Sequence, residues 1–123
     1  KERLAEYRRE YEKNRYKDDI EYRLRKNLRR RIQYAMRQQN NRKSKSTIDL
    51  IDCSFEELRT HIESLFVDGM SWDNYGEWHV DHIKPCASFE LAEEEQQKEC
   101  FCYTNLQPLW AEDNRKKGAK NDT

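Results

Sequence analysis

The stretch that decides the fold runs from residue 78 to residue 118. It begins with WHVDHIKP at residues 78–85 and ends with NLQPLWAEDNRKKG at residues 105–118. We predict a strand over residues 77–83, a short second strand over residues 105–108, and a last helix over residues 111–117 that Gly118 ends. An Asp-His pair at a strand end, followed by one Asn and by a second Asn nine residues later on a helix, is an uncommon arrangement.

These side chains suit phosphodiester hydrolysis. That reaction requires a water made nucleophilic, neutralised phosphoryl oxygens and a stabilised leaving oxygen. A single metal can supply the last two and a neutral imidazole the first. Asp81 offers a hard oxygen ligand, His82 an imidazole and Asn114 a neutral carbonyl oxygen. Asp81 and His82 would have to address one phosphate together, but neighbours in a regular strand point to opposite faces. We therefore predict that the strand ends or bulges at these two residues.

The motif resembles the HNH endonuclease family, and the resemblance to phage and algal-virus members is close. It covers the chain from about residue 51 onward and, more loosely, the basic helix before it. The resemblance implies an α+β fold of the ββα-metal type, a hairpin followed by a helix that holds one divalent metal, with additional helices and an N-terminal basic arm. It also implies a free-standing or homing-type endonuclease that leaves 5′-phosphate and 3′-hydroxyl ends.

The resemblance assigns a role to each site residue. Asp81 and Asn114 correspond to the metal ligands and His82 to the general base. Asn105 corresponds to a residue that bonds across the hairpin to the backbone near His82, which suits an amide that donates and accepts at once. Lys117, one helical turn beyond Asn114, corresponds to a phosphate contact; the alternative is a lysine that caps the helix.

The metal is predicted from the ligand types. Oxygen ligands alone favour Mg²⁺ or Mn²⁺, whereas an added imidazole favours Zn²⁺, Ni²⁺ or Co²⁺, so we expect Mg²⁺ with Mn²⁺ as the alternative. We do not expect a structural zinc, because the chain has no C-x-x-C pair and a single C-x-C is a weak signal. The nominal zinc ligands are His79, His82, Cys86, Cys100 and Cys102. His79 either packs against the helix or approaches the metal or the DNA.

The formal net charge of zero conceals a division along the chain. Residues 1–47 contain 17 Lys/Arg and 7 Asp/Glu, whereas residues 48–123 contain 7 Lys/Arg and 17 Asp/Glu. A basic arm on an acidic body favours a polyanion partner, here DNA contacted mainly through its backbone. The alternative is a solvated helix face that pairs with the acidic half.

We therefore divide the chain into a basic helical DNA-binding arm with its linker, residues 1–47, and a nuclease domain, residues 48–123. The arm is predicted to hold a helix over residues 1–16, a second helix capped by Asp18, and a flexible linker over residues 38–47. The second helix has an apolar stripe for docking and displays its basic side chains outward. The predicted DNA contacts in the arm are Arg25, Lys26, Arg29, Arg30, Arg31, Arg37, Arg42 and Lys43.

Two further helices are predicted in the second part. Ser54 and Glu57 form the S-x-x-E capping box of a helix that we expect to end near Gly69. Residues 93–101 form a short helix between the two strands. His61 lies on the first of these helices and is interpreted as a surface or packing residue.

Composition excludes several classes. No run approaches the roughly 18 apolar residues of a membrane span, and we expect no signal peptide. We expect an intracellular, cytoplasmic protein with reduced thiols and no membrane partner, acting in a virus- or phage-infected host. Two alternatives stay open, a noncatalytic nucleic-acid-binding module on the same fold and the nuclease domain of a larger protein.

Overall fold

The protein has an α+β fold. The computed structural model describes the backbone of residues 2–121 and the side chains of residues 3–14 and 19–117. The helices are α1 (Glu2–Asp18), α2 (Ile20–Gln38), α3 (Thr47–Ile51), α4 (Phe55–Ser64), α5 (Glu94–Phe101) and α6 (Ala111–Asn121). The strands are β1 (Trp78–His82) and β2 (Leu106–Trp110), and short 3₁₀ turns lie at Trp72–Asn74, Cys86–Ser88 and Tyr103–Asn105.

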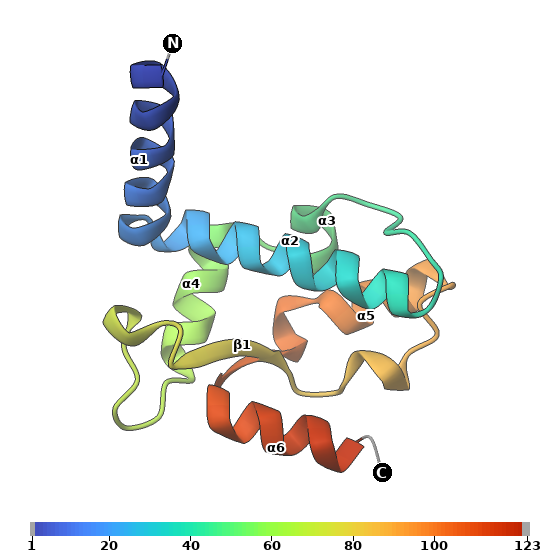
Figure 1. The fold of residues 1–123 in the computed structure, drawn as a ribbon. Helices are drawn as coiled ribbons and strands as arrows, with labels where there is room; N and C mark the ends of the chain where they lie inside the picture. The colour runs from blue at the N-terminus through green and yellow to red at the C-terminus, as the bar shows by residue number, and fades with distance from the viewer. Residues whose placement is uncertain (1, 122–123) are drawn as a thin grey trace.

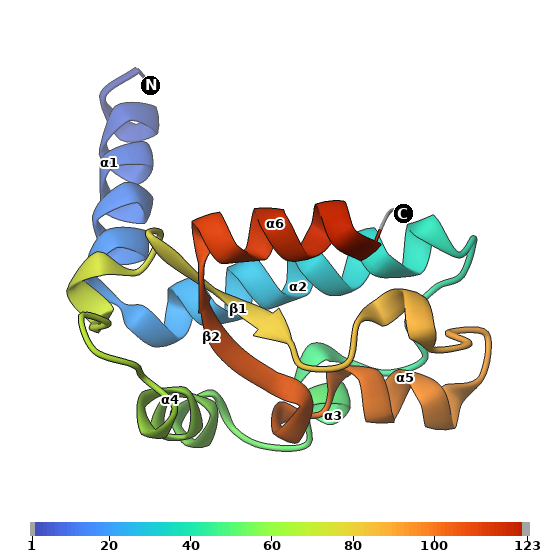
Figure 2. The ribbon, with the colours of Figure 1, turned by 90° about the horizontal axis from the view of Figure 1, so that it is seen from below.

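The two strands form an antiparallel pair that leads directly into α6. Trp78 pairs with Trp110 at one end and His82 with Leu106 at the other. The connection between the strands contains α5, and α6 begins at the residue after β2 (Figure 2). Gly118 does not end α6, as the sequence had suggested, because the helix continues to Asn121. A helical Gly costs only about 0.5–1 kcal/mol relative to Ala, which continued backbone bonding can offset.

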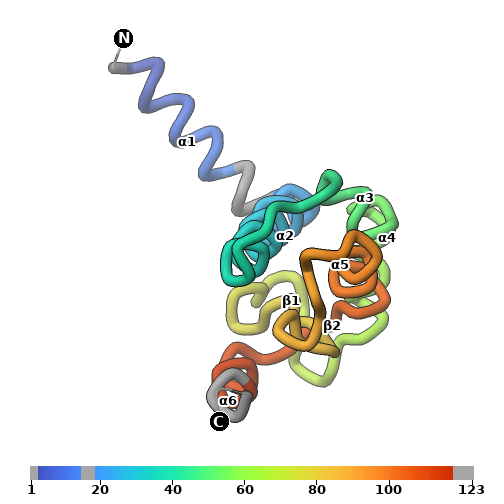
Figure 3. Tube along the Cα trace, turned by 90° about the vertical axis from the view of Figure 1, so that its right-hand side faces the viewer, coloured from blue at the N-terminus to red at the C-terminus, as the bar shows by residue number. Residues whose placement is uncertain are grey.

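The hairpin lies between two helices. Figures 1 and 3 show α2 on one side of β1 and α6 on the other, while α1 projects away from the rest of the molecule. This arrangement brings the basic helix α2 and the C-terminal helix α6 to the same strand. No helix within residues 2–121 combines the length and apolar character that crossing a bilayer requires.

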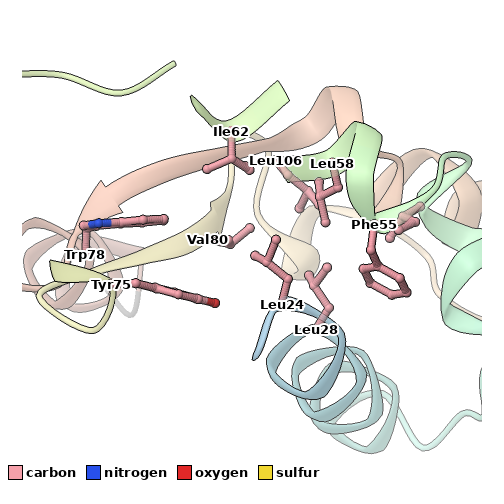
Figure 4. Close-up of a cluster of buried hydrophobic side chains, with 10 residues drawn as sticks. Leu24, Leu28, Phe55, Leu58, Ile62, Tyr75, Trp78, Val80 and Leu106 are labelled. Carbon is pink, nitrogen blue, oxygen red and sulfur yellow. The ribbon is translucent and has the colours of Figure 1, made fainter. Parts of the chain in front are cut away.

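The core joins α2 to the hairpin and to α4. Leu24 and Leu28 of α2 pack with Ile62 of α4, Val80 of β1 and Leu106 of β2 (Figure 4). A second cluster continues along α2 and takes in α3, α5 and the connection between the strands; its buried residues are Ile32, Ala35, Met36, Leu50, Phe89, Leu91, Cys100 and Phe101. Because α2 belongs to both clusters, it packs in one continuous core with elements from residues 48–123.

The segment after α2 is anchored, which corrects the expectation of a flexible linker. The Gln39 side chain donates to the carbonyl oxygens of Cys86 and Phe89 and accepts a bond from the Leu91 amide. Gln97 of α5 likewise accepts bonds from both the amide and the hydroxyl of Ser44. Both glutamines are polar side chains that composition alone would assign to solvent. They instead bind this segment to the connection between β1 and β2.

The first residues of α2 and α4 are set by side chains that cap the helix N-termini. Ser54 and Glu57 form the predicted capping box of α4, but the helix ends at Ser64 rather than near Gly69. Gly69, at a φ of 91°, lies in the loop that follows. Asp19, rather than the predicted Asp18, caps α2 by accepting a bond from the Tyr22 amide.

Candidate active site

Asp81 and His82 lie where β1 ends. His82 is the last residue of β1, and beyond it the Ile83 amide still donates to the Asn105 carbonyl at 2.8 Å. Asp81 and His82 keep only 8 % and 9 % of their full exposure. Both nevertheless line one hollow at the surface. The strand therefore ends at this pair, one of the two local geometries that the sequence predicted.

This hollow has a volume of about 840 Å³ and walls from distant parts of the chain. Asp81 and His82 enter it from β1, and Asn114 enters it from α6. α2 adds a basic and polar part to the lining through Arg30, Arg31, Tyr34, Ala35 and Gln38, and Gln39 follows directly after this helix. The structure thus brings three of the four predicted core site residues to one hollow beside the basic helix.

Asn105 is the fourth of these predicted site residues. It is not among the residues that line the hollow, and its side chain bridges backbone segments next to the end of β1. Its Oδ1 accepts a bond from the Lys84 amide at 2.9 Å. Its Nδ2 donates to the carbonyls of Lys84 at 3.1 Å and of Cys100 at 2.8 Å. One amide therefore connects the turn after His82, the end of α5 and the start of β2.

Lys117 is turned toward the strand. Its Nζ donates to Asp81 Oδ2 at 2.8 Å and to the His82 carbonyl at 2.6 Å. The side chain is 29 % exposed, against 12 % for that of Asp81. The lysine predicted to contact phosphate therefore binds the carboxylate that was predicted to hold the metal.

The His82 ring lies beside two cysteines, Cys86 and Cys100, that the sequence offered only as nominal zinc ligands. Its ligand nitrogen and the Sγ atoms of Cys86 and Cys100 all lie within 4.8 Å of one another. The ring packs edge-on against Phe101 at 5.6 Å between centroids. Nε2 of His82 is buried, with no hydrogen-bond partner among the described residues. The sequence named these three residues only within a wider set of nominal zinc ligands, and it could not show that they meet, because Cys100 comes from α5.

The two cysteines have opposite acidities. The Cys100 thiol lies 3.5 Å from Cys86 Sγ and donates a hydrogen bond to it. This bond is the main reason that the pKa of Cys86 is lowered to about 5; His82 acts in the same direction and burial opposes it. The same bond, together with burial, raises the pKa of Cys100. Cys86 is therefore the better thiolate of the pair.

His79 faces α2. It lines a separate hollow of about 330 Å³ together with Arg23, Asn27 and Arg31. Burial lowers the pKa of His79, and the positive charge of Arg31 lowers it further. Of the roles left open for this residue, packing against a helix is the one that its position matches. His61 also packs, with its Nε2 3.0 Å from the Leu106 carbonyl oxygen.

Most of the predicted DNA contacts are exposed, but two are held inward. Arg31 is half-buried and donates to the Val80 carbonyl. Lys43 is half-buried and donates to the Thr47 hydroxyl at 3.3 Å. The sequence could not show that these two side chains are held inward, because their partners, Val80 and Thr47, lie outside α2. The exposed residues are Arg25, Lys26, Arg29, Arg30, Arg37 and Arg42.

Comparison with known proteins finds viral relatives. No protein-family model and no solved structure matches the chain. It is similar to two uncharacterized proteins of Acanthamoeba polyphaga mimivirus. It is 40% identical to L246 over 110 residues, which is 89% of this chain and 47% of that protein. It is 38% identical to L426 over 112 residues, which is 90% of this chain and 47% of that protein. The chain thus spans about half the length of the curated relatives it matches.

Proposed function

We propose that the chain is a metal-dependent DNA endonuclease of the HNH type. One observation carries the proposal: Asp81, His82 and Asn114 line a single hollow together with Arg30 and Arg31 of α2. A carboxylate, an imidazole, an amide oxygen and guanidinium groups are the groups that phosphodiester hydrolysis requires. Three other hollows lined by described residues lack this combination.

Asp81 and Asn114 fit a hard cation and would hold it. A carboxylate and an amide oxygen are donors that Mg²⁺ and Mn²⁺ accept, and Mg²⁺ keeps several waters when few protein ligands are present. The Lys117 ammonium at 2.8 Å balances the charge of Asp81, so a bound cation would share this carboxylate with Lys117 or replace it. A bound cation would neutralise phosphoryl charge and stabilise the leaving oxygen.

His82 would act as the general base. Its backbone is fixed by the pairing with Leu106, and its ring is held against Phe101. Asn105 fixes the turn that follows through bonds to both backbone groups of Lys84. These contacts limit the orientations open to the imidazole, which a base must keep to remove a proton from an attacking water. The expected products carry 5′-phosphate and 3′-hydroxyl ends.

The exposed basic side chains of α2 would hold the DNA backbone. Arg30 lines both the hollow of Asp81 and His82 and the hollow of His79. Arg29 and Arg37 are exposed on the same helix. Guanidinium groups bind phosphate through paired hydrogen bonds, and such contacts are independent of base sequence. We therefore expect binding that is nonspecific and strongly salt-dependent. The viral relatives favour action inside an infected cell.

A noncatalytic nucleic-acid-binding module is the second candidate. Two observations favour it. The Asp81 carboxylate is already paired with Lys117, and Nε2 of His82 is buried, so neither group is open to a metal or a water in this structure. In that case α2 would bind DNA and the hollow would be structural. Either function is compatible with the chain being one part of a larger protein, since it matches 47% of each viral relative.

A plasmid-cleavage assay separates these functions. Supercoiled plasmid is incubated with the chain in Mg²⁺, in Mn²⁺ and in excess chelator, and the nicked and linear products are measured. We expect cleavage that requires the metal and is abolished in Asp81→Ala, with DNA binding retained. Binding without cleavage in either metal would support the noncatalytic module and reject the endonuclease.

A further inference from the structure

The cluster of His82, Cys86 and Cys100 contains two thiols that the proposed nuclease mechanism does not use. Two sulfur atoms and an imidazole nitrogen lie within 4.8 Å of one another, and His82 and Cys86 also line the hollow. Cys100 is fully buried, and His82 keeps 9 % of its exposure. An imidazole Nε2 that is buried without a hydrogen-bond partner is costly, because its desolvation is not offset by any bond. A cation bound through Nε2 would offset that cost.

The spacing of the three atoms fits a tetrahedral soft cation. With a metal–sulfur bond of about 2.3 Å, two thiolates at tetrahedral angles lie ~3.8 Å apart. Cys86 Sγ and Cys100 Sγ are already 3.5 Å apart. The positions of the three groups are also fixed by independent elements, since His82 ends β1, Cys86 begins a 3₁₀ turn and Cys100 lies in α5. Little rearrangement is therefore needed for coordination.

We propose that His82, Cys86 and Cys100 form a binding site for a soft divalent cation, with Zn²⁺ as its natural class of ligand. Sulfur and imidazole are the donors that Zn²⁺ prefers over Mg²⁺. The three side chains supply three ligands, and a water from the hollow supplies the fourth. Each cysteine that coordinates gives up its thiol proton to solvent, so binding releases protons.

This site is separate from the proposed Mg²⁺ site in its donors and goes beyond the proposed function. Asp81 and Asn114 present oxygen to the hollow, whereas the cluster presents sulfur and nitrogen. The two sites meet at His82, whose neighbour in β1 is Asp81. An imidazole nitrogen that coordinates a cation has no lone pair left to accept a proton. Occupation of the soft-metal site and action of His82 as a base therefore exclude each other.

A cobalt titration tests the site directly and needs no cleavage activity. The chain is kept reduced with a phosphine, titrated with Co²⁺, and followed by the thiolate-to-cobalt charge-transfer absorption; Zn²⁺ is then added to displace the cobalt. We expect one equivalent of Co²⁺ to bind and Zn²⁺ to replace it. Cys86→Ser should weaken binding by at least about 100-fold, since loss of a ligand exceeds the usual 10–100-fold effect of a supporting residue.

Matched controls come from the other cysteines. Cys53→Ser and Cys102→Ser each remove a half-buried thiol outside the cluster and should leave the titration unchanged. Circular dichroism verifies that each variant is folded. In the unmodified chain, Zn²⁺ should also protect Cys86 from iodoacetamide while leaving the alkylation of Cys53 unaffected, which avoids any folding effect of a substitution. Absence of the absorption, its persistence in Cys86→Ser, or alkylation of Cys86 at the same rate with Zn²⁺ would overturn the proposal.

Discussion

Lys117 Nζ lies 2.8 Å from Asp81 Oδ2 and 2.6 Å from the carbonyl oxygen of His82. One ammonium group thus connects α6 to the end of β1 and compensates a carboxylate whose side chain is only 12 % exposed. If Asp81 binds a divalent cation, that cation and Lys117 compete for the same carboxylate. The ion pair then sets both the stability of the site and its affinity for metal.

Replacing Lys117 should separate these two effects. Lys117→Met keeps most of the apolar stem and removes the charge, which leaves Asp81 without its partner. We expect a decrease of about 1–3 kcal/mol in the free energy of unfolding. We also expect Mg²⁺ to bind about fivefold more tightly, because one positive charge a few ångströms away is worth about 1 kcal/mol in a water-like dielectric. Thermal melts and calorimetric titration with Mg²⁺ measure the two quantities.

Lys116→Met is the matched control for this substitution. Lys116 pairs with Glu112 on the solvent side of α6, where the two side chains are 68% and 75% exposed. Exposed pairs contribute about 0–1 kcal/mol, so this variant should melt and bind Mg²⁺ nearly as the unmodified chain does. Equal effects of the two substitutions would show that the Asp81 contact has no special role.

His82→Ala tests the base. If His82 removes a proton from the attacking water, the substitution should reduce plasmid cleavage by at least about 10²-fold while DNA binding is retained. Gel-shift and cleavage assays on the same preparation compare the two properties. His61→Gln is the control, because His61 lies outside the hollow and contacts the Leu106 carbonyl. Full activity of His82→Ala would remove His82 from the mechanism.

The two asparagines should differ in their response to metal. Asn114→Ala removes a proposed ligand, so its cleavage should recover in part at high Mg²⁺ or Mn²⁺. Asn105→Ala removes bonds to Lys84 and to the Cys100 carbonyl, and we expect a decrease of about 1–3 kcal/mol in stability that metal does not restore. A metal titration of cleavage beside thermal melts compares them. Recovery of Asn105→Ala alone would mean that the two roles are reversed.

The exposed charges of α2 should govern affinity for DNA. Arg29→Gln with Arg30→Gln should weaken binding to all sequences alike and reduce the log–log salt slope by close to one unit for each phosphate that the variant no longer neutralises. Arg31 is excluded from this variant because it donates to the Val80 carbonyl and its removal would disturb β1. Lys98→Gln, an exposed change on α5, is the control. Weaker binding confined to one sequence would indicate base recognition instead.

Features with a local signal were predictable from the sequence. The capping box of Ser54 and Glu57 satisfies its bonds within four residues, so the start of α4 followed from the sequence. An end or a bulge of the strand at Asp81 and His82 followed from the need for two neighbouring side chains to address one phosphate, and the structure has the end. The helix α3 was missed because five residues are too few for an apolar period.

Features that depend on distant partners were not predictable. The anchoring of residues 39–46 rests on Gln39 and Gln97, whose partners lie some fifty residues away in the chain. Arg31 has the same residue type and helical setting as Arg30, yet a strand carbonyl beside it turns its side chain inward. The approach of Cys100 to His82 depends on the placement of α5 in the core. Periodicity along one helix contains none of this information.

Zn²⁺ should inhibit the Mg²⁺-dependent cleavage that we propose, because its binding at His82, Cys86 and Cys100 occupies the imidazole that serves as the base. The zinc concentration that halves the rate should match the zinc Kd obtained from the displacement of Co²⁺, once competition by the cobalt present is taken into account. Cys86→Ser should raise the inhibitory concentration by at least about 100-fold, measured against that variant's own rate in Mg²⁺. Cys53→Ser should not shift it, since Cys53 lies outside the cluster. Inhibition that is equally strong in Cys86→Ser would mean that zinc acts by replacing Mg²⁺ at Asp81 and Asn114, and the two metal sites would then not compete through His82.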